Sequence, residues 1–213
     1  LLGRELYGRS VGLWASFLLS ISHWHIIISR AGFRACTAPL MLALTWYFLV
    51  RGLKTHRRWF YALSGLFLGL GLYTYNAFMI APAMMVFMLL TSLLTGRRGD
   101  LFADWDKVIL LFLVAIYVFI PLGRYAFEQP ERYLYRAATR VTGLEAPRPS
   151  QLLATLLETT RKALLMFNYR GDAGFAANVP YLRELGFFTA VFFVLGLAYV
   201  LWRWRHGYNL TVL

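Results

Sequence analysis

The chain has 213 residues, of which 59% are hydrophobic and only 15% are charged, and its mean hydropathy is +0.55. Charged residues make up about a quarter of an ordinary soluble domain, so this composition excludes a typical soluble protein and indicates a chain that lies mostly in lipid. The formal net charge of +12 does not point to nucleic acid as a partner. The Lys and Arg residues fall in short clusters between apolar runs, where membrane proteins keep them.

Six apolar runs predict membrane-spanning helices, because a helix needs about 20 residues to cross about 30 Å of hydrocarbon. In chain order they are residues 11–29, 35–50, 59–73, 77–95, 107–122 and 185–202. The third and fourth runs meet at residues 73–76, where we expect either a tight turn or a broken helix. Non-helical backbone at membrane depth needs protein or water beside it.

The distribution of basic residues predicts the orientation. On one side, the short connections hold Arg4, Arg9, Arg51, Lys54, Arg57, Arg58, Arg97, Arg98, Lys107, Arg203 and Arg205. The opposite short connections hold only Arg30 and Arg34. Short loops rich in Lys and Arg resist translocation, so the first set should lie in the cytoplasm and residues 123–184 outside.

The long outer segment is expected to lie on the membrane surface. After a candidate N-cap at Ser150, leucines recur at helical spacing, at Leu153, Leu156, Leu157 and Leu164. This pattern predicts an amphipathic interfacial helix, and residues 131–141 predict another short helix.

These predictions together describe an all-α, polytopic transmembrane helical bundle. Residues 1–122 should form about five spans, residues 123–184 the extracytoplasmic loop, and residues 185–213 a further helix and the start of another span. The chain begins with Leu1 rather than Met and ends in an apolar run, so we expect a piece of a longer membrane protein.

Arg30 and Arg34 are the first candidate binding residues, because cations are otherwise scarce on the outer side. A guanidinium group matches phosphate oxygens and stays charged at physiological pH, so a lipid phosphate is one partner for them. Snorkelling to lipid head groups is an equally good interpretation. Tyr73, Tyr75 and Asn76 at the next outer turn can also donate hydrogen bonds to an anion, although ordinary interfacial tyrosines explain them as well.

Asn168, Arg170 and Asp172 form a second polar cluster, directly after the amphipathic helix. A solvated turn is the simpler interpretation. Asp172 is a candidate general base, but it also lies close enough to Arg170 in the chain to pair with it.

The sequence supplies little material for a cofactor, and none is expected. It has one cysteine, Cys36, and four histidines. His23 and His25 do not share a helix face at a spacing of two, so a divalent metal has no support here. No Walker-type loop, Gly-x-Gly-x-x-Gly, Gly-x-Ser-x-Gly or His-Glu-x-x-His motif occurs.

Four stretches in a characteristic order, residues 2–12, 22–34, 69–75 and 167–172, are similar to a known family. With them the chain resembles the membrane glycosyltransferases of family 39, the protein mannosyltransferase and aminoarabinose transferase-like members of the GT-C superfamily. Two departures stand out. His23 occupies a position where relatives often have Pro, and Ala176 and Ala177 replace an Arg-His pair found in many of them.

The resemblance implies an enzyme that moves a sugar from a polyprenyl-phosphate carrier to a protein, lipid or glycan acceptor. The reaction would take place on the extracytoplasmic face of the bilayer, and a bacterial inner membrane is expected. Arg30 and Arg34 would then neutralise the carrier phosphate and Tyr73 and Tyr75 would orient it. The 168–172 cluster would contact sugar, acceptor or phosphate, and the acidic base would lie upstream of Leu1.

A flippase or other transporter of lipid-linked substrates is the alternative function. Transporters place polar groups near the middle of their spans, along the substrate path. In this sequence the middle of each predicted span is nearly all apolar and polar residues gather at the outer ends, which favours chemistry at one face. A scaffold subunit of a complex is a third interpretation that the sequence leaves open.

Overall fold

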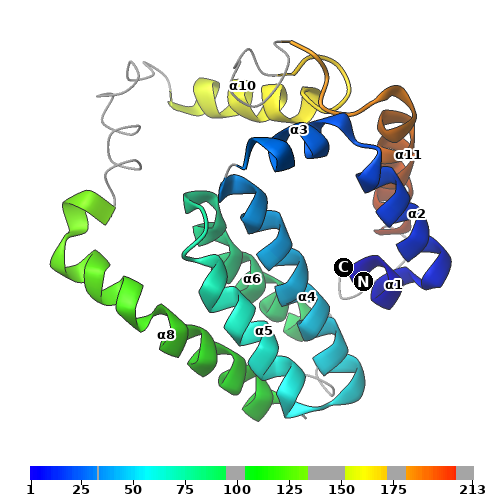
Figure 1. Ribbon diagram of the computed structural model, residues 1–213. Coiled ribbons are helices and arrows are strands. Elements are labelled where there is room, and N and C mark those ends of the chain that lie inside the picture. Colours follow the sequence, from blue (N-terminus) through cyan, green and yellow to red (C-terminus); the bar gives the residue numbers. More distant parts are fainter. Residues whose placement is uncertain (33, 95–103, 134–151, 172–180, 205–213) are drawn as a thin grey trace.

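The computed structural model describes residues 1–32, 34–94, 104–133, 152–171 and 181–204 of the chain (Figure 1). Every regular element within these ranges is a helix, which confirms the predicted all-α class for this part of the chain. The α-helices are α1 (Leu2–Tyr7), α2 (Arg9–Ser20), α3 (His23–Ala31), α4 (Thr37–Thr55), α5 (Arg58–Gly71), α6 (Ala81–Leu94), α8 (Trp105–Glu128), α10 (Leu152–Leu165) and α11 (Phe187–Trp204). Two 3-10 helices, η1 (Arg34–Cys36) and η2 (Asn76–Ile80), precede α4 and α6.

In the described ranges, one helix is long and apolar enough to cross a membrane by itself, namely α8 with 24 residues. The pair α2 and α3 meets the same requirement only if both helices count as one broken span. Shorter apolar stretches occupy Asn76–Leu90 and Phe187–Tyr199. The described helices therefore supply one clear membrane-crossing candidate, and the six-span bundle stays a prediction.

The first predicted span is not one continuous helix. α2 and α3 are bent by 63° relative to each other, and Ser22 between them has an extended backbone with ψ of 112°. Just before the break, the Ser20 hydroxyl donates to the carbonyl of Phe17 at 2.7 Å. Serine side chains that bond to nearby carbonyls compete with regular helix, which gives a physical reason for the break.

Two other helices can be compared directly with the sequence-based prediction. α8 continues to Glu128, beyond the predicted end at residue 122, although Pro121 lies inside it. α10 lies where the leucine spacing predicted a helix, and its location at the membrane surface stays a prediction. Ser150 and most of the helix predicted at 131–141 lie outside the described residues.

The core of the molecule is the bundle of α4, α5, α6 and α8 (Figure 1), in which α5 packs against both α4 and α8. Its buried residues are Leu49, Tyr61, Leu68, Phe78, Ala81, Met85, Leu89, Leu111 and Ala115. Two glycines let the backbone of α8 approach α5 closely. A Cβ on Gly65 would lie 2.2 Å from the carbonyl oxygen of Leu111, and one on Gly69 would lie 2.7 Å from the Cβ of Val118.

α1 joins this bundle through polar contacts with α4. The Lys54 ammonium group donates to the backbone carbonyl of Glu5, and the Glu5 carboxylate lies 3.9 Å from the Arg51 guanidinium. The Arg51 group also lies over the ring of Phe60, 4.9 Å from its centroid. α1 is thus held at the end of the bundle where α4 leads into α5.

The helix ends and the connections between helices lie at two opposite ends of the molecule in Figure 1. The upper end carries the C-terminal end of α3, the connection from α5 to η2, the C-terminal end of α8, and α10, which lies crosswise to the bundle. The lower end carries the connection from α4 to α5 and the beginning of α8. The connections predicted to lie outside therefore share one end of the fold.

The close approach of α5 and α8 predicts a strong effect of the substitution Gly65→Ala. The added methyl group would meet backbone atoms of α8, which cannot swing aside as a side chain can. We expect a loss of about 2 kcal/mol in the free energy of unfolding, which is roughly 5 °C in Tm for a chain of this size. Thermal unfolding of the purified protein in detergent measures this effect.

Gly196→Ala is the matched control, because a Cβ at Gly196 on α11 meets no atom within 4 Å. Alanine favours helix over glycine by up to about 1 kcal/mol, so the Tm of this variant should be unchanged or slightly raised. An equal loss in both variants would contradict the proposed packing of α5 against α8.

Candidate functional site

The turn formed by residues 73–76 joins α5 to η2 at the upper end of the bundle. α5 ends at Gly71, where a Cβ would lie only 2.1 Å from the ring of Phe78. The Thr74 hydroxyl donates to the carbonyl of Gly71 at 2.6 Å and closes the turn. The chain folds back here because the Phe78 ring occupies the space beside a residue without a side chain.

The Tyr73 hydroxyl donates its hydrogen bond to the neighbouring helix α8, so this proton is not available to a ligand. Its hydroxyl donates to the carbonyl of Val118 at 2.7 Å, three residues before Pro121. A proline inside a helix has no N–H to donate, and its ring disturbs the carbonyls of the preceding turn. Neighbouring polar groups can satisfy the carbonyls that are freed in this way. The carbonyl that loses its helical donor at Pro121 is that of Tyr117, four residues earlier, so the bond from Tyr73 to the adjacent carbonyl of Val118 ties the 73–76 turn to the proline-containing part of α8.

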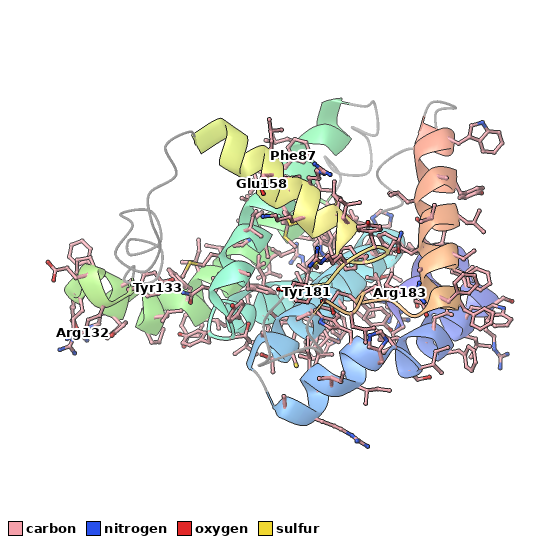
Figure 2. The ribbon with its side chains drawn as sticks, turned by 90° about the horizontal axis from the view of Figure 1, so that it is seen from above. Phe87, Arg132, Tyr133, Glu158, Tyr181 and Arg183 are labelled. Atoms are coloured by element: carbon pink, nitrogen blue, oxygen red, sulfur yellow. The ribbon has the colours of Figure 1, made fainter. Side chains whose placement is uncertain are left out.

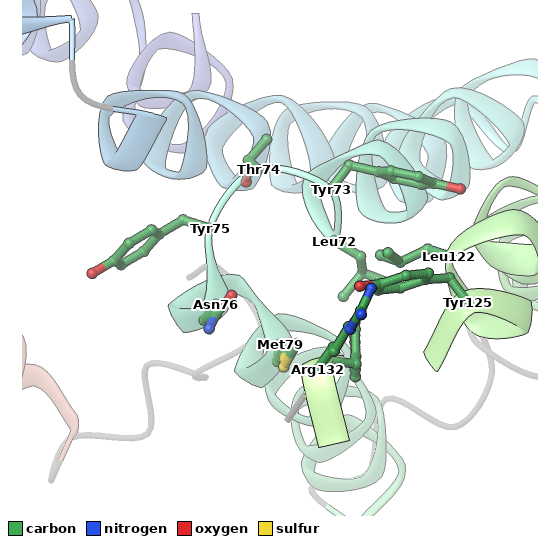
Figure 3. A pocket seen from close by; sticks show the side chains of 10 residues that line it. Leu72, Tyr73, Thr74, Tyr75, Asn76, Met79, Leu122, Tyr125 and Arg132 are labelled. Carbon is green, nitrogen blue, oxygen red and sulfur yellow. The ribbon is translucent and has the colours of Figure 1, made fainter. Parts of the chain in front are cut away.

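A cavity of about 380 Å³ opens between this turn and the C-terminal end of α8 (Figure 3). We call it the α8 cavity. Its lining residues are Leu72, Tyr73, Thr74, Tyr75, Asn76, Met79, Leu122, Tyr125, Arg132 and Tyr133. None of these ten residues is acidic, so the cavity combines apolar walls with one cation and several neutral polar groups.

The polar groups of the α8 cavity are not equally free. Arg132 and Tyr125 both line the cavity, and in Figure 3 the Tyr75 ring extends in the direction opposite to them. The hydroxyl protons of Tyr73 and Thr74 are already donated to backbone carbonyls. The side chains of Tyr75, Asn76, Tyr125, Arg132 and Tyr133 make no hydrogen bond with a described residue, so their polar groups remain able to bind a ligand.

Arg30 and Arg34 precede α4 and do not line the α8 cavity. Arg30 is exposed near the C-terminal end of α3, and no hydrogen bond or ion pair joins it to another described residue. Arg34 begins η1, and its side chain lies outside what the structure describes. The structure thus places this predicted pair at the same end of the fold as Tyr73 and Tyr75, but in a separate position.

Residues 168–171 of the predicted cluster follow α10, and two backbone hydrogen bonds join the end of α10 to the residues before α11. Glu184 N donates to Met166 O at 3.0 Å, and Leu185 N donates to Phe167 O at 3.1 Å. The Arg170 guanidinium lies over the Tyr181 ring, 4.4 Å from its centroid. The side-chain oxygen of Asn168 is buried and accepts no hydrogen bond from a described residue. Asp172 lies outside the described residues.

Figure 2 shows that the α8 cavity and the residues after α10 lie in different parts of the molecule. Arg132 and Tyr133, from the α8 cavity, lie at one flank of the molecule, and Tyr181, the ring under Arg170, lies away from them. The structure therefore joins Tyr73 and Tyr75 with Arg132, and does not bring the described part of the 168–172 cluster into the same cavity.

A buried carboxylate, Asp104, links α5 and α8 at the opposite end of the bundle. Its side chain is only 1% exposed. The His56 Nδ1 and the Tyr61 hydroxyl each lie 2.7 Å from its Oδ2, and the Lys107 ammonium group pairs with its Oδ1. We call these four residues the Asp104 cluster.

The cluster keeps Asp104 ionised. Burial by itself would raise the pKa of this carboxyl, because it disfavours the charged form. Hydrogen bonds from Lys107, Tyr61 and His56 outweigh burial and bring the pKa below its ordinary value. The negative charge is therefore balanced inside the protein, and the cluster behaves as a structural anchor.

The sequence pattern does not single out Arg132 or Asp104 as site residues. Arg132 lies just beyond α8, in the stretch 131–141 that predicts a short helix. Asp104 is one of ten acidic residues, and the orientation is predicted from the basic residues alone. The signal available for Asp104 was an acidic residue directly before a long apolar helix with Lys107 three positions later, a spacing that allows side-chain pairing.

The described residues offer little for a metal ion. Among them, no three His, Cys, Asp or Glu side chains come together. The buried Nε2 of His23 has no hydrogen-bond partner among the described residues, while His25 is exposed. His23 and His25 are therefore not arranged as a ligand pair in this part of the chain.

The profile of one protein family, dolichyl-phosphate-mannose-protein mannosyltransferase, matches residues 1–125, more than half of the chain. The chain belongs to this family. Comparison with curated proteins and with solved structures gives no match. The resemblance inferred from the four sequence stretches is thereby confirmed at the level of the family.

Membership of this mannosyltransferase family makes the protein a relative of membrane glycosyltransferases. The matched region contains Arg30, Arg34, the 73–76 turn and most of α8, and it ends at Tyr125. Arg132 and the 168–171 turn lie beyond it. The family match therefore covers most of the bundle and does not extend to the residues after α8.

The Asp104 cluster generates a prediction about stability. Asp104→Asn removes a buried charge and leaves Lys107 without its carboxylate partner, so we expect a loss of about 3 kcal/mol in the free energy of unfolding. Asp106→Asn is the control, because the Asp106–Arg58 pair is largely exposed and such pairs contribute less than about 1 kcal/mol. Thermal unfolding of both variants at pH 7 measures the difference.

The same cluster predicts the direction of a pH dependence. The pKa of Asp104 is lower in the folded than in the unfolded protein. The ionised carboxylate therefore adds its full share to the free energy of unfolding above the ordinary pKa of about 4, and this share is lost as the pH falls through the lowered pKa. The Tm of the wild type should therefore fall more steeply than that of Asp104→Asn below about pH 4. If the Tm of both proteins fell equally with pH, protonation of Asp104 would not be coupled to folding.

Proposed function

We propose that this protein transfers a sugar from a polyprenyl-phosphate-linked donor to an acceptor at the extracytoplasmic face of the membrane. The family match over residues 1–125 is the observation that carries the proposal. The name of that family specifies a mannose carried on a lipid phosphate and a protein acceptor, and the same class of donor is proposed here. The acceptor is a protein, lipid or glycan that reaches the membrane surface.

The arrangement of the helices supports a reaction at one face. The C-terminal end of α3, the 73–76 turn, the C-terminal end of α8 and α10 all lie at the upper end in Figure 1. A lipid-linked donor presents its phosphate at the membrane interface, because the charged group cannot enter the hydrocarbon without a large cost. We propose that the broken pair α2–α3 crosses the membrane together with α4, α5, α6, α8 and α11, and that this upper end faces outside.

Arg30 and Arg34 are the proposed cations for the leaving phosphate. As the bond to the sugar breaks, negative charge grows on the phosphate oxygen, and a positioned guanidinium stabilises that charge. Arg30 is exposed and free of described partners, which leaves it able to bind. Tyr75 and Tyr73 would orient the carrier, Tyr73 through its support of α8. Asn168, Arg170 and Asp172 would contact the sugar, the acceptor or the phosphate.

The substitution Arg30→Ala in the full-length protein tests the phosphate assignment. We expect transfer from a polyprenyl-phosphate sugar to fall by about a hundredfold, the usual cost of removing one group that stabilises developing charge. Transfer of labelled sugar in membranes of a strain that lacks the natural enzyme is the measurement. A transporter would yield no covalent product, so the wild-type assay also separates the two functions.

Arg9→Ala is the control, because Arg9 is an exposed arginine at the beginning of α2. Its removal should leave transfer unchanged. Unchanged transfer in Arg30→Ala, or an equal loss in both variants at equal expression, would refute the role of Arg30.

Cysteine labelling tests the orientation. In a Cys36→Ser background, Tyr169→Cys should react with a membrane-impermeant reagent added from outside, because Tyr169 is 77% exposed in the outer segment. Thr55→Cys, at the C-terminal end of α4, should react only after permeabilisation. The reverse pattern would invert the proposed topology.

A further inference from the structure

The lower end of the bundle in Figure 1 carries more cations than its acidic groups can neutralise. Among the described residues, three acidic side chains lie there, and each lies against a basic side chain. The pairs are Glu5 with Arg51, Asp104 with Lys107, and Asp106 with Arg58. The acidic charge of this end is therefore already balanced within the protein.

Arg4, Lys54 and Arg57 have no carboxylate partner among the described residues, and all three are exposed. The Lys54 ammonium group donates to the backbone carbonyl of Glu5, an acceptor without net charge, and α1 with Arg4 packs against α4. Arg57 follows Lys54 after three positions and precedes α5. These three cations, which we call the lower basic surface, give this end an excess of positive charge.

Two exposed tryptophans lie at the same end. Trp59 and Trp105 belong to the first turns of α5 and α8, and they are 66% and 65% exposed. The hydrogen bond of 2.9 Å between Arg58 and Asp106 joins the residues next to them, so both rings belong to neighbouring helix ends. Tryptophan is enriched where hydrocarbon meets head groups, because its apolar ring also carries a polar N–H group. The two rings therefore mark the level at which α5 and α8 leave the hydrocarbon.

An anionic phospholipid of the bilayer fits both features. Its head group carries the negative charge that the lower basic surface attracts, and its glycerol and acyl chains lie at the level of the tryptophans. A soluble anion would gain from the cations alone, and a zwitterionic lipid would gain little from them. The cytoplasmic leaflet holds the anionic lipids, and each Lys or Arg near its surface strengthens binding by about fivefold.

We propose that the lower end binds an anionic phospholipid of the cytoplasmic leaflet, with Arg4 and Arg57 beside its head group and Trp59 and Trp105 against its glycerol region. The site lies at the end of the bundle opposite the 73–76 turn and the α8 cavity, so it is separate from the groups assigned to the sugar donor. The inference rests on the proposed orientation for the choice of leaflet, and it is independent of the transfer reaction. The bound lipid would hold α1, α5 and α8 together at the cytoplasmic interface.

The experiment measures the binding of radiolabelled phosphatidylglycerol to the purified full-length protein in a non-ionic detergent. Arg4→Ala and Arg57→Ala should each weaken binding about fivefold, and the double variant about twentyfold, because each change removes one charge near the head group. Arg57→Lys should keep most of the affinity, since attraction at a membrane surface needs the charge rather than the planar fork. Added salt should weaken binding by the wild type, because it screens exposed charges.

Arg124→Ala is the matched control, because it removes the same unit of charge from an exposed arginine at the upper end, where Arg124 is paired with Glu128. It should bind phosphatidylglycerol like the wild type. An equal loss in Arg124→Ala would show attraction by the overall charge of the chain and overturn the proposal. The Tm of Arg4→Ala and Arg57→Ala without added lipid should match that of the wild type, because neither side chain makes a hydrogen bond or ion pair with a described residue.

The role of the tryptophans is tested by fluorescence. Phosphatidylglycerol with brominated acyl chains should quench part of the tryptophan fluorescence of the wild type. This part should be missing in the double variant Trp59→Phe and Trp105→Phe. An equal loss of fluorescence on addition of the lipid to both proteins would contradict the place of these rings in the site.

Competing ligands separate the lipid from other occupants of a basic surface. Unlabelled phosphatidylglycerol should displace the probe, whereas phosphatidylcholine, which has no net charge, and glycerol 3-phosphate, which has no acyl chains, should compete far more weakly. Equal competition by either compound, or stronger competition by a polyprenyl phosphate, would overturn the assignment. So would binding that is retained in the double variant Arg4→Ala and Arg57→Ala, or no binding by the wild type.

The binding experiment and the transfer assay can fail separately. If phosphatidylglycerol binds as expected and no sugar is transferred, the lipid site stands and the glycosyltransferase proposal fails. If sugar is transferred and Arg57→Ala binds the lipid like the wild type, the proposed function stands and the lipid site fails.

Discussion

The contact between α5 and α8 is the interaction on which the rest of the structure depends. Tyr61, Gly65 and Gly69 follow one another at four-residue steps and form one stripe along α5, and Tyr73 lies just beyond the upper end of this stripe, in the 73–76 turn. The tyrosine at the lower end of the stripe bonds to Asp104 before α8, and the one at the upper end bonds to the carbonyl of Val118. Between them, two glycines admit the backbone of α8.

This arrangement has a physical reason in a membrane environment. Lipid is as apolar as the helix surfaces, so the hydrophobic effect does not drive helices together there, and close packing and hydrogen bonds have to do so. Gly65 and Gly69 supply the close packing. The two tyrosines supply polar contacts at the ends, where α8 otherwise has a buried charge at one side and a proline-disturbed carbonyl ladder at the other.

The candidate site is a consequence of this contact. Because α8 runs past Pro121 to Glu128, Tyr125 and Arg132 reach the level of the 73–76 turn and form the α8 cavity with it. The part of the chain that carries the family match thus builds one wall of the cavity, and the stretch after α8 supplies its charge.

The sequence alone determined the helical class, the approximate bounds of most helices and the family, because apolar composition, helical spacing and short motifs are local properties. It did not reveal the break after Ser20, the continuation of α8, the Asp104 cluster or Arg132. Asp104 lies 48 positions from His56 in the chain, and Arg132 is still farther along the chain from the 73–76 turn. Only tertiary packing decides which of many distant polar groups meet, since side-chain contacts between elements depend on how the helices cross rather than on local spacing.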